Sequence, residues 1–342
     1  MSSESKSPVR VRDPGPGMPF VLKGLEYVRD LGAGSEGKVV LVRDTDNGDQ
    51  YALKYALKCR ATDHEAAAAK ELGDCDTLVR VHKTGTVEGR HKRMYGYMVM
   101  DLHQGSVADW TYDPQLEWDI DPDKQEWLKE EYMLKRMLFD ISHAFDHMQK
   151  LGWIHRDVKP QNMGIQIRNG KSRMVLADLG FTRKIVDEKG ELIDAERRDF
   201  DSLTTWRFAS PRTALRLPQY YVDDLGNLLM SVACDHFVKR NAVMFGDNPK
   251  QDKAFAGFDF LADPQAALNR MRVRSGMDYF QKIPEWYKHA AVLAREQMKN
   301  NPTGSVDYRR ILDPLVHELR EPDPPINSSK KEEADVSMFL VD

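Results

Sequence analysis

The sequence predicts an α+β fold with two lobes: a small antiparallel sheet of five strands with one main helix, then a larger, mainly helical part. Over roughly the first hundred residues, short segments alternate apolar and polar side chains between Gly-containing turns. After about residue 104, apolar side chains recur every three to four residues. The chain has 342 residues, of which 41% are hydrophobic, and this is enough material for two lobes.

Five segments are predicted as strands because β-branched and aromatic side chains alternate with polar ones. The Asn47-Gly48 pair is a strong hairpin signal between the second and third strands. The alanine-rich segment 64–72 then switches to helix formers and meets Gly73, which suits a helix C-cap. The expected strands are LEYVRDL (25–31), KVVLVRDT (38–45), QYALKYAL (50–57), TLVRVHKTGTV (77–87) and RMYGYMVMDL (93–102).

The second part is predicted to be helical. In segment 130–152, apolar residues from Leu134 to Met148 follow helical spacing, and Gly152 ends the pattern. Segment 223–239 predicts another core helix through Leu225, Leu228, Leu229 and Val232. The basic turn GRHKR (89–93) is expected to be a solvated face.

Composition narrows the class of protein. A net charge of −4 argues against general nucleic-acid binding, and no apolar run is long enough to span a membrane. Cys59, Cys75 and Cys234 form no ligand pattern and are expected to be buried thiols. A reduced compartment, the cytoplasm with the nucleus as an alternative, and a monomeric state fit best. Residues 1–18 and 321–342 are predicted as disordered tails; Met338–Val341 could instead be a docking peptide.

The segment LGAGSEGKV carries Gly32, Gly34 and Gly37 in the pattern GxGxxGxV. Glycines let a backbone approach phosphates closely and present its N–H groups to them. Because this turn joins two strands, it favours a flap over ATP rather than a dinucleotide fold. The predicted ATP contacts here are Leu31, Gly32, Ala33, Gly34, Ser35, Glu36, Gly37, Lys38 and Val39, with Ala52 and Lys54 on the next strand.

Two further motifs complete a phosphoryl-transfer set. HRDVKPQN (155–162) fits H-R-D-x-x-x-x-N, and ADLG places Asp178 sixteen residues after Asn162. Asp157 is expected to accept or orient a substrate hydroxyl, and Lys159 to neutralise the transferring phosphoryl group. The oxygens of Asn162 and Asp178 suit Mg²⁺ rather than zinc.

These motifs resemble the eukaryotic protein kinase superfamily over residues 20–318, and most closely its casein kinase 1 group. The closer likeness lies in MVMDLHQGSVADW, in TTWRFASPRT, which stands where most kinases have Ala-Pro-Glu, and in VDDLGNLLM. It implies a kinase domain over 19–320, with lobes 19–103 and 104–320, ATP and Mg²⁺ as cofactors, and protein substrates with acidic or already phosphorylated sites. It also implies adenine-side contacts from Met100, Asp101, His103 and Asp109, and a brace under the catalytic loop from Asp224.

Two lysines compete for the phosphate-anchoring role. Lys54 and Lys58 share strand parity but lie about 13 Å apart along the strand. Lys54 is favoured because it falls opposite Val39–Leu41 and leaves room for the chain to reach a partner on the following helix. Glu65 is the expected partner, and Glu71 is the alternative, which would make Lys58 possible again.

The sequence leaves several alternatives for the substrate and for the level of activity. Glu36 at the flap tip could repel phosphate, and Leu179 replaces the usual Phe after Asp178. The alternative function is a kinase-like scaffold with little catalysis. A third hypothesis is a kinase that acts on small molecules. Lys159 disfavours specificity for tyrosine. Phosphorylation of Ser202, Thr204 or Thr205 is undecided. A basic cluster for acidic substrates could come from Arg183, Lys184, Arg197, Arg198 and Arg207.

Overall fold

The computed structural model describes residues 18–34, 37–57, 60–103, 105–108, 126–168, 171–193, 208, 210, 212, 217–232 and 285–319. These residues divide into two compact units. Unit 1 contains described residues 18–67 and 81–102, and unit 2 contains 68–80 and the described residues from 103 onwards. This division does not test the predicted boundaries between the tails and the lobes, which stay predictions.

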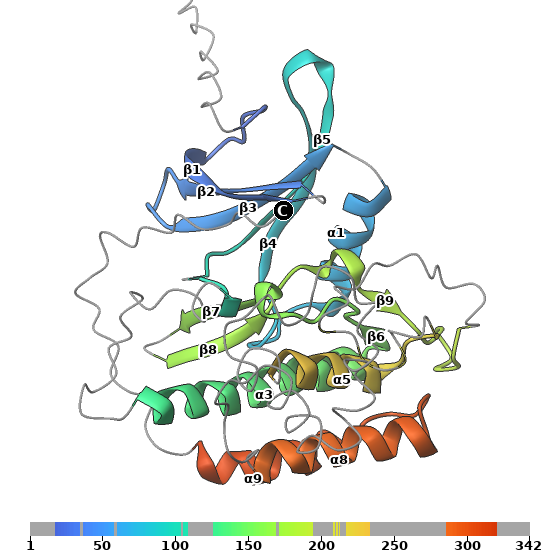
Figure 1. The fold of residues 1–342 in the computed structure, drawn as a ribbon. Coiled ribbons are helices and arrows are strands. Elements are labelled where there is room, and N and C mark those ends of the chain that lie inside the picture. The colour runs from blue at the N-terminus through green and yellow to red at the C-terminus, as the bar shows by residue number, and fades with distance from the viewer. Residues whose placement is uncertain are drawn as a thin grey trace, which may run out of the picture. The chain divides into compact units, whose positions relative to one another are not determined.

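Unit 1 is built on the predicted five-stranded antiparallel sheet, in the order β1-β2-β3-β5-β4 (Figure 1). Its strands are β1 (Leu25–Gly34), β2 (Gly37–Asp44), β3 (Gln50–Leu57), β4 (Val81–Glu88) and β5 (Met94–Asp101). The Asn47-Gly48 hairpin is confirmed: Gly48 has a φ of +80°, a conformation that glycine adopts without strain. β4 starts later than predicted, because Leu78 instead forms a parallel bridge with Leu176.

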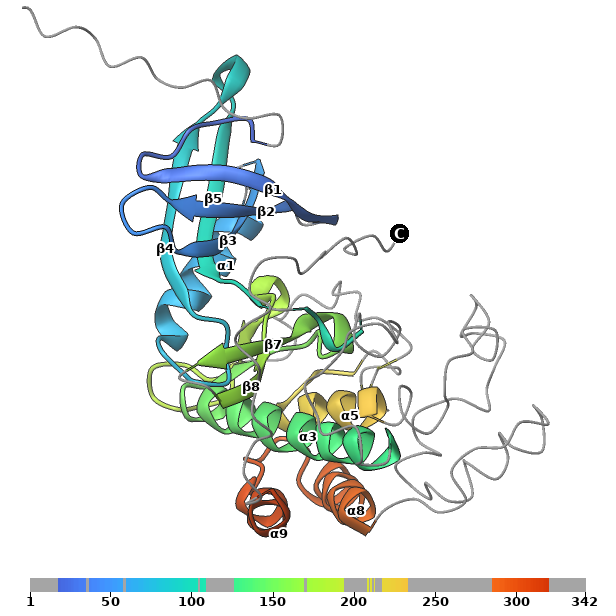
Figure 2. The ribbon, with the colours of Figure 1, turned by 90° about the vertical axis from the view of Figure 1, so that its left-hand side faces the viewer.

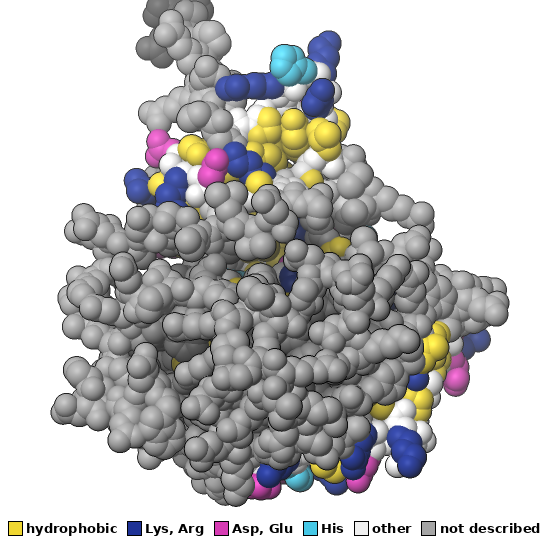
Figure 3. Space-filling model, in the orientation of Figure 1, with side chains coloured by type: hydrophobic (Ala, Val, Ile, Leu, Met, Phe, Trp, Pro, Cys, Tyr) yellow, Lys and Arg dark blue, Asp and Glu magenta, His cyan; other side chains and the backbone are white. Residues whose placement is uncertain are grey.

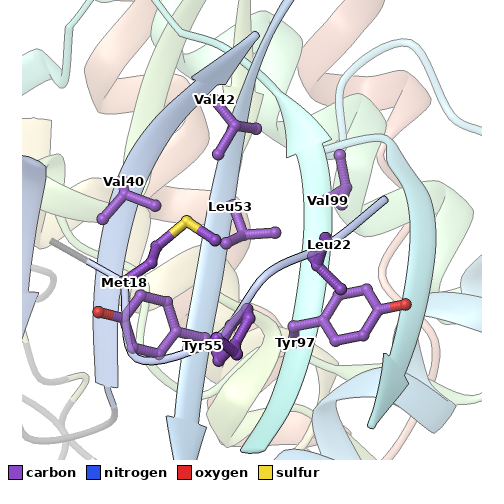
Figure 4. Close-up of a cluster of buried hydrophobic side chains, with 9 residues drawn as sticks. Met18, Leu22, Val40, Val42, Leu53, Tyr55, Tyr97 and Val99 are labelled. Atoms are coloured by element: carbon purple, nitrogen blue, oxygen red, sulfur yellow. The ribbon is translucent and has the colours of Figure 1, made fainter. Parts of the chain in front are cut away.

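One face of this sheet is covered by the N-terminal segment 18–22, an arrangement that the strand pattern does not predict. Met18, Phe20 and Leu22 pack against side chains of β2, β3 and β5 (Figure 4). Phe20 is 2% exposed, and its ring lies 5.1 Å from that of Tyr55 in an edge-on arrangement. Met18 therefore belongs to the core of unit 1, although the sequence placed it at the end of a disordered tail.

The opposite face of the sheet meets helix α1 (Arg60–Leu72). A Cβ on Gly96 of β5 would come within 2.9 Å of the Thr62 side chain, so a glycine there permits the close approach of this helix. The predicted C-cap is confirmed, since Gly73 has a φ of +61° and its N–H donates to the Ala69 carbonyl at 3.2 Å.

The turn between β4 and β5 is basic and exposed, as predicted for a solvated face. Arg90, His91, Lys92 and Arg93 are all exposed, and Figure 3 shows Lys, Arg and His side chains gathered at this tip. His91 and Lys92 have φ values of 61° and 57°, which close the tight turn between the strands.

Unit 2 is mainly helical. Helices α3 (Glu126–Lys150) and α5 (Tyr221–Val232) form a layer with the β7–β8 hairpin on one side and helices α8 (Glu285–Asn300) and α9 (Arg309–Glu318) on the other (Figures 1 and 2). The hairpin strands are β7 (Met163–Arg168) and β8 (Lys171–Leu176), and the short strands β6 (Trp153–Ile154) and β9 (Arg183–Lys184) pair separately. Every residue of α5 is buried.

Two predictions were drawn from composition: that the cysteine thiols are buried, and that no segment spans a membrane. Cys75 is only half-buried, with Sγ 3.4 Å from Thr77 Oγ1, so the prediction of a buried thiol is wrong there. Cys59 and Cys234 lie outside the described residues. None of the described helices is both long and apolar enough to cross a membrane.

Truncating Phe20 should test whether the N-terminal segment contributes to the stability of unit 1. Phe20→Ala removes a fully buried ring and should lower the free energy of unfolding by about 3–5 kcal/mol. The neighbouring Val21→Ala, at a side chain that is 36% exposed, should change it by less than about 0.5 kcal/mol. Chemical denaturation of both variants would measure this, and equal small losses would show that the segment is not part of the core.

Candidate active site

Lys54 and Glu65 form an ion pair in unit 1. Lys54 pairs with Val39 across β2 and β3, and its side chain lies on the sheet face that meets helix α1. Its Nζ lies 2.8 Å from Glu65 Oε1, and the two side chains are only 12% and 8% exposed. Such a pair is costly to desolvate and therefore needs good geometry to persist. The structure thus joins the lysine and the glutamate that the sequence favoured.

Glu71, the alternative partner, is engaged elsewhere. Glu71 Oε1 forms an ion pair with Lys184 Nζ of β9, and both residues belong to unit 2. Glu71 therefore does not pair with Lys54 in this structure. Lys58 lies outside the described residues.

Four of the apolar residues predicted to contact ATP belong to one cluster of unit 1. Leu31 and Ala52 are buried there together with Leu41, and Val39 and Met100 pack against them. These residues come from β1, β2, β3 and β5, whose antiparallel register brings them to one face. A cluster of this kind can hold a flat apolar group such as a purine ring.

Gly37 has a structural role within the glycine-rich turn. β1 and β2 continue to the pair Gly34–Gly37, and Ser35 and Glu36 between them lie outside the described residues. Gly37 has a φ of +142°, and a Cβ there would stand 2.5 Å from the Tyr55 carbonyl oxygen. No other residue fits so close to β3 without moving the backbone.

The remaining predicted ATP contacts have other partners or are not described. Lys38 Nζ lies 2.7 Å from Asp30, and Asp101 contacts the His82 ring, both within unit 1. The His103 ring lies against Gly164 of β7, where any Cβ would overlap it. Asp109 lies outside the described residues. Gly32 and Ala33 pair with Val39 and Lys38 along β1 and β2.

In unit 2, the loop His155–Asn162, which the sequence predicts to be the catalytic loop, rests on the Asp224 carboxylate of α5. The two oxygens of Asp224 accept hydrogen bonds from the backbone N–H groups of His155 at 2.6 Å and Arg156 at 2.8 Å. Arg156 has a φ of +74°, an uncommon conformation for a residue with a side chain. The paired hydrogen bonds brace the loop in this conformation; the kinase resemblance predicted the brace, but not the conformation of Arg156.

His155 links this loop to the chain before Asp178. It is fully buried, and burial lowers its pKa, so the imidazole is neutral. Its Nε2 lies 3.0 Å from the Ala177 carbonyl, which can only accept, so Nε2 carries the proton. Its Nδ1 then accepts from the Asp157 N–H at 3.3 Å.

Asp157 has one carboxylate oxygen engaged by neighbours and one that lacks a hydrogen-bond partner among the described residues. Its Oδ2 lies 2.9 Å from Lys159 Nζ and 2.9 Å from Asn162 Nδ2. Its Oδ1 is buried and has no hydrogen-bond partner among the described residues. A carboxylate held in this way can accept a proton at one defined position, which is the requirement for a general base.

Asn162 and Asp178 are connected through the backbone. The Asn162 amide nitrogen donates to both the carbonyl and the carboxylate of Asp157, which leaves its Oδ1 as a hard oxygen donor. The Ala177 N–H donates to the Asn162 carbonyl at 2.8 Å, which fixes the residue before Asp178. An amide and a carboxylate fit Mg²⁺, which usually takes one or two protein ligands and completes its shell with phosphate and water.

Sequence reasoning missed the partners of Asp223. Its Oδ1 accepts from Ser210 Oγ at 2.7 Å, and its Oδ2 accepts from the Tyr220 N–H at 2.8 Å. The sequence contains the pair Asp223-Asp224, but the kinase resemblance predicts a role only for Asp224.

Asp224 should make stability depend on pH in a measurable way. Burial raises its pKa from 3.8 to about 7, although the His155 and Arg156 N–H groups favour the charged form. Between these values the folded state keeps a proton that the unfolded state releases, so this group's contribution to the free energy of unfolding falls as pH rises. Replacing Asp224 by Asn removes that slope, which is at most about 1.4 kcal/mol per pH unit.

The difference in unfolding free energy between wild type and Asp224→Asn should therefore shrink as the pH is raised from 4.5 to 7. Urea denaturation at several pH values would measure it. Asp307→Asn, at an exposed position, controls for the loss of a carboxylate in general. A difference that stays constant with pH would contradict the assignment.

Comparison with known proteins identifies the family of the chain. Residues 25–214 match the protein kinase domain model. The chain is 26% identical over 200 residues to ribosomal protein S6 kinase alpha-1 of Rattus norvegicus, covering 56% of this chain and 24% of the relative. It is 29% identical over 170 residues to serine/threonine-protein kinase SBK1 of Mus musculus, covering 48% of this chain and 37% of that protein.

A third relative is serine/threonine-protein kinase/endoribonuclease IRE1 of Hypocrea jecorina, 22% identical over 220 residues, which cover 64% of this chain and 16% of the relative. The chain thus spans well under half the length of each of these relatives. The family model, in contrast, matches more than half of the chain, including the candidate residues of unit 1 from Leu31 onwards and those of unit 2 up to Asp178. The chain belongs to the protein kinase domain family.

Proposed function

We propose that this chain is an active serine/threonine protein kinase, which transfers the γ-phosphate of ATP to protein hydroxyls with the help of Mg²⁺, within a domain spanning residues 19–320. The observation that carries the proposal is the state of Asp157. The residue is 2% exposed, one carboxylate oxygen is held by Lys159 and Asn162, and the other has no hydrogen-bond partner among the described residues. Its loop rests on the buried Asp224.

The residues of unit 1 would bind the nucleotide. The apolar cluster around Leu31 and Ala52 offers a surface for the purine, with Val39 and Met100 at its edge. Lys54 is a buried ammonium held by Glu65, so it can meet a phosphate without reorganising. The glycines before and after the turn let the backbone N–H groups approach phosphate oxygens.

The residues of unit 2 would handle the hydroxyl and the metal. Asp157 Oδ1 orients the substrate hydroxyl and takes its proton, while Lys159 holds a positive charge beside the reacting group. Asn162 and Asp178 would hold Mg²⁺, whose charge neutralises the phosphate oxygens during transfer. His155 stays neutral and keeps the loop and the Asp178 segment together.

Casein kinase 1-like specificity for acidic or phosphorylated protein sites forms part of the proposal. It is supported by the likeness of TTWRFASPRT and VDDLGNLLM to that group and by the basic residues of the activation segment. The basic cluster is smaller than expected, however, because Lys184 is already paired with Glu71. Arg197, Arg198 and Arg207, together with Ser202, Thr204 and Thr205, lie outside the described residues.

The described residues do not favour the alternative of an inactive scaffold. Lys54, Asp157, Asn162 and Asp178 are all present; Lys54 is paired with Glu65, and Asp157 contacts Lys159 and Asn162, which supports the proposal. A monomer in the cytoplasm or nucleus remains our expectation for the whole protein.

Asp157→Asn should abolish most of the turnover while preserving the fold. The amide oxygen can still accept from Lys159 and Asn162, but the group in the place of Oδ1 becomes an amide nitrogen, which cannot accept a proton. With Mg²⁺-ATP and casein, ADP release should fall by about 10²–10⁴-fold. A thermal shift with Mg²⁺-ATP, equal in both proteins, would show that binding is intact. Equal rates of ADP release would refute the proposal.

Lys54→Met and Lys58→Met form a matched pair, because the sequence predicts the same strand parity for both lysines. Lys54→Met removes the charge that Glu65 holds and should lower phosphoryl transfer to casein by at least about 10²-fold. Lys58→Met should keep most of the activity, because Lys54 already occupies the position beside Glu65. Incorporation of labelled phosphate into casein measures both, and the reverse ranking would show that Lys58 is the anchor.

A further inference from the structure

The hairpin of β4 and β5 ends in a strongly basic tip. Residues 81–100 contain four lysines and arginines but a single acidic residue, Glu88. Three of the four basic residues, Arg90, Lys92 and Arg93, lie at the tip, and all three are exposed. The hairpin extends beyond the other strands of the sheet (Figures 1 and 2), so the tip is a convex end of unit 1 that carries a local excess of positive charge.

Contacts of the backbone fix the shape of this tip. The Gly89 N–H donates to the Arg93 carbonyl at 2.8 Å, and the Arg90 N–H donates to the Pro19 carbonyl of the N-terminal segment at 2.8 Å. A Cβ on Gly89 would stand 2.7 Å from the Tyr95 ring and 2.8 Å from the Pro19 oxygen, so the chain packs closely there. The basic side chains are therefore displayed from a backbone that is held in place.

Apolar side chains are exposed at the same end of unit 1. Leu57 is 51% exposed and pairs with Tyr95 across β3 and β5, and Met94, which directly follows the basic turn, is 44% exposed. Val21, also exposed, lies two residues after Pro19. These three are the exposed large hydrophobic side chains among the described residues of unit 1. Figure 3 shows hydrophobic side chains next to the basic ones at this end.

Positive charge beside exposed apolar side chains on a convex tip fits the surface of an anionic membrane. Lysine and arginine are attracted to acidic lipid headgroups, and apolar side chains can enter the boundary between headgroups and acyl chains. A convex tip can approach a flat bilayer, whereas a bound peptide usually needs a groove or a free sheet edge. The chain as a whole has a net charge of −4, so the attraction is confined to the tip.

We propose that the β4–β5 tip is a docking surface for membranes that contain anionic lipid such as phosphatidylserine. Arg90, Lys92 and Arg93 contact the acidic headgroups, and Leu57 and Met94 enter the interface between headgroups and acyl chains. None of these five residues belongs to the candidate active site. Docking therefore determines where the protein acts and leaves its chemistry unchanged.

Cosedimentation of the full chain with lipid vesicles tests this proposal. Wild type should bind vesicles of phosphatidylcholine mixed with phosphatidylserine and should not bind pure phosphatidylcholine. Lys92→Ser/Arg93→Ser should weaken binding about 25-fold, because each basic residue near an anionic surface contributes about fivefold. Leu57→Ser should weaken it about fivefold, through the loss of a half-exposed apolar side chain. Raising the salt concentration should reduce the charge-dependent part.

Lys23→Ser/Arg43→Ser is the matched control for charge. It also removes two exposed positive charges from unit 1. These residues lie at the opposite end of the sheet, where the Thr45 N–H donates to the Gly24 carbonyl and Arg43 pairs with Gln50 at the start of β3. This variant should bind the mixed vesicles within about twofold of wild type, since its charges are remote from the tip.

Leu192→Ser is the corresponding control for apolar exposure, because Leu192 is an exposed leucine of unit 2. It should also bind as wild type does. The proposal is wrong if wild type does not bind the mixed vesicles, or if the tip variants bind as tightly as wild type. Retention of wild type on immobilised polyglutamate without any vesicle binding would indicate an acidic protein partner instead. Binding is measured without ATP, so the result does not depend on whether the chain transfers phosphate.

Discussion

The geometry of unit 2 depends on the buried carboxylate of Asp224. Two consecutive backbone N–H groups can donate to one carboxylate only if the chain between them turns sharply, and Arg156 adopts a φ of +74° to do so. An arginine in that conformation costs of order 1 kcal/mol, so the surrounding contacts must impose it. Once the turn is set, His155 reaches the Ala177 carbonyl, and Asp157 lies where Lys159 and Asn162 can hold it. The contact of His155 with Ala177 and the contacts of Asp157 with Lys159 and Asn162 thus depend on the turn at Arg156.

Helix α5 concentrates this role in one rigid element. Its apolar side chains fill the core of unit 2, and its polar ones hold Ser210, the catalytic loop and, through Ser231 Oγ, the Val158 carbonyl at a long 3.4 Å. The arrangement is not optimal for stability, because burial raises the pKa of Asp223 to about 6 and that of Asp224 to about 7. Burial of these carboxylates thus lowers stability. In return, a fully packed helix holds their oxygens in defined positions.

The sequence predicted local features and those distant contacts that a recognised motif implies, such as the contact of Asp224 with the loop at His155, but it did not predict other distant pairings. The Asn47-Gly48 hairpin, the Gly73 cap and the position of Lys54 opposite Val39 follow from short-range rules, and the structure shows all three. The docking of Phe20 on the sheet and the Glu71–Lys184 pair were not predictable, because nothing near 20 or 71 identifies a partner that lies far along the chain. Cys75 was misjudged because its residue type favours burial, whereas its position after helix α1 leaves it half-exposed. The contacts of Asp223 with Ser210 and Tyr220 could not be predicted, because no periodic pattern in the sequence marks the residues around Ser210.

The backbone at Gly37 changes what the glycine motif can be taken to mean. Its φ of +142° and the 2.5 Å separation that a Cβ would have from the Tyr55 oxygen show that the third glycine is required for β2 to lie against β3. Any chain that keeps this pairing of β2 with β3 would need that glycine whether or not it binds a nucleotide. The presence of the third glycine therefore reports the packing of the sheet and does not by itself indicate a phosphate site.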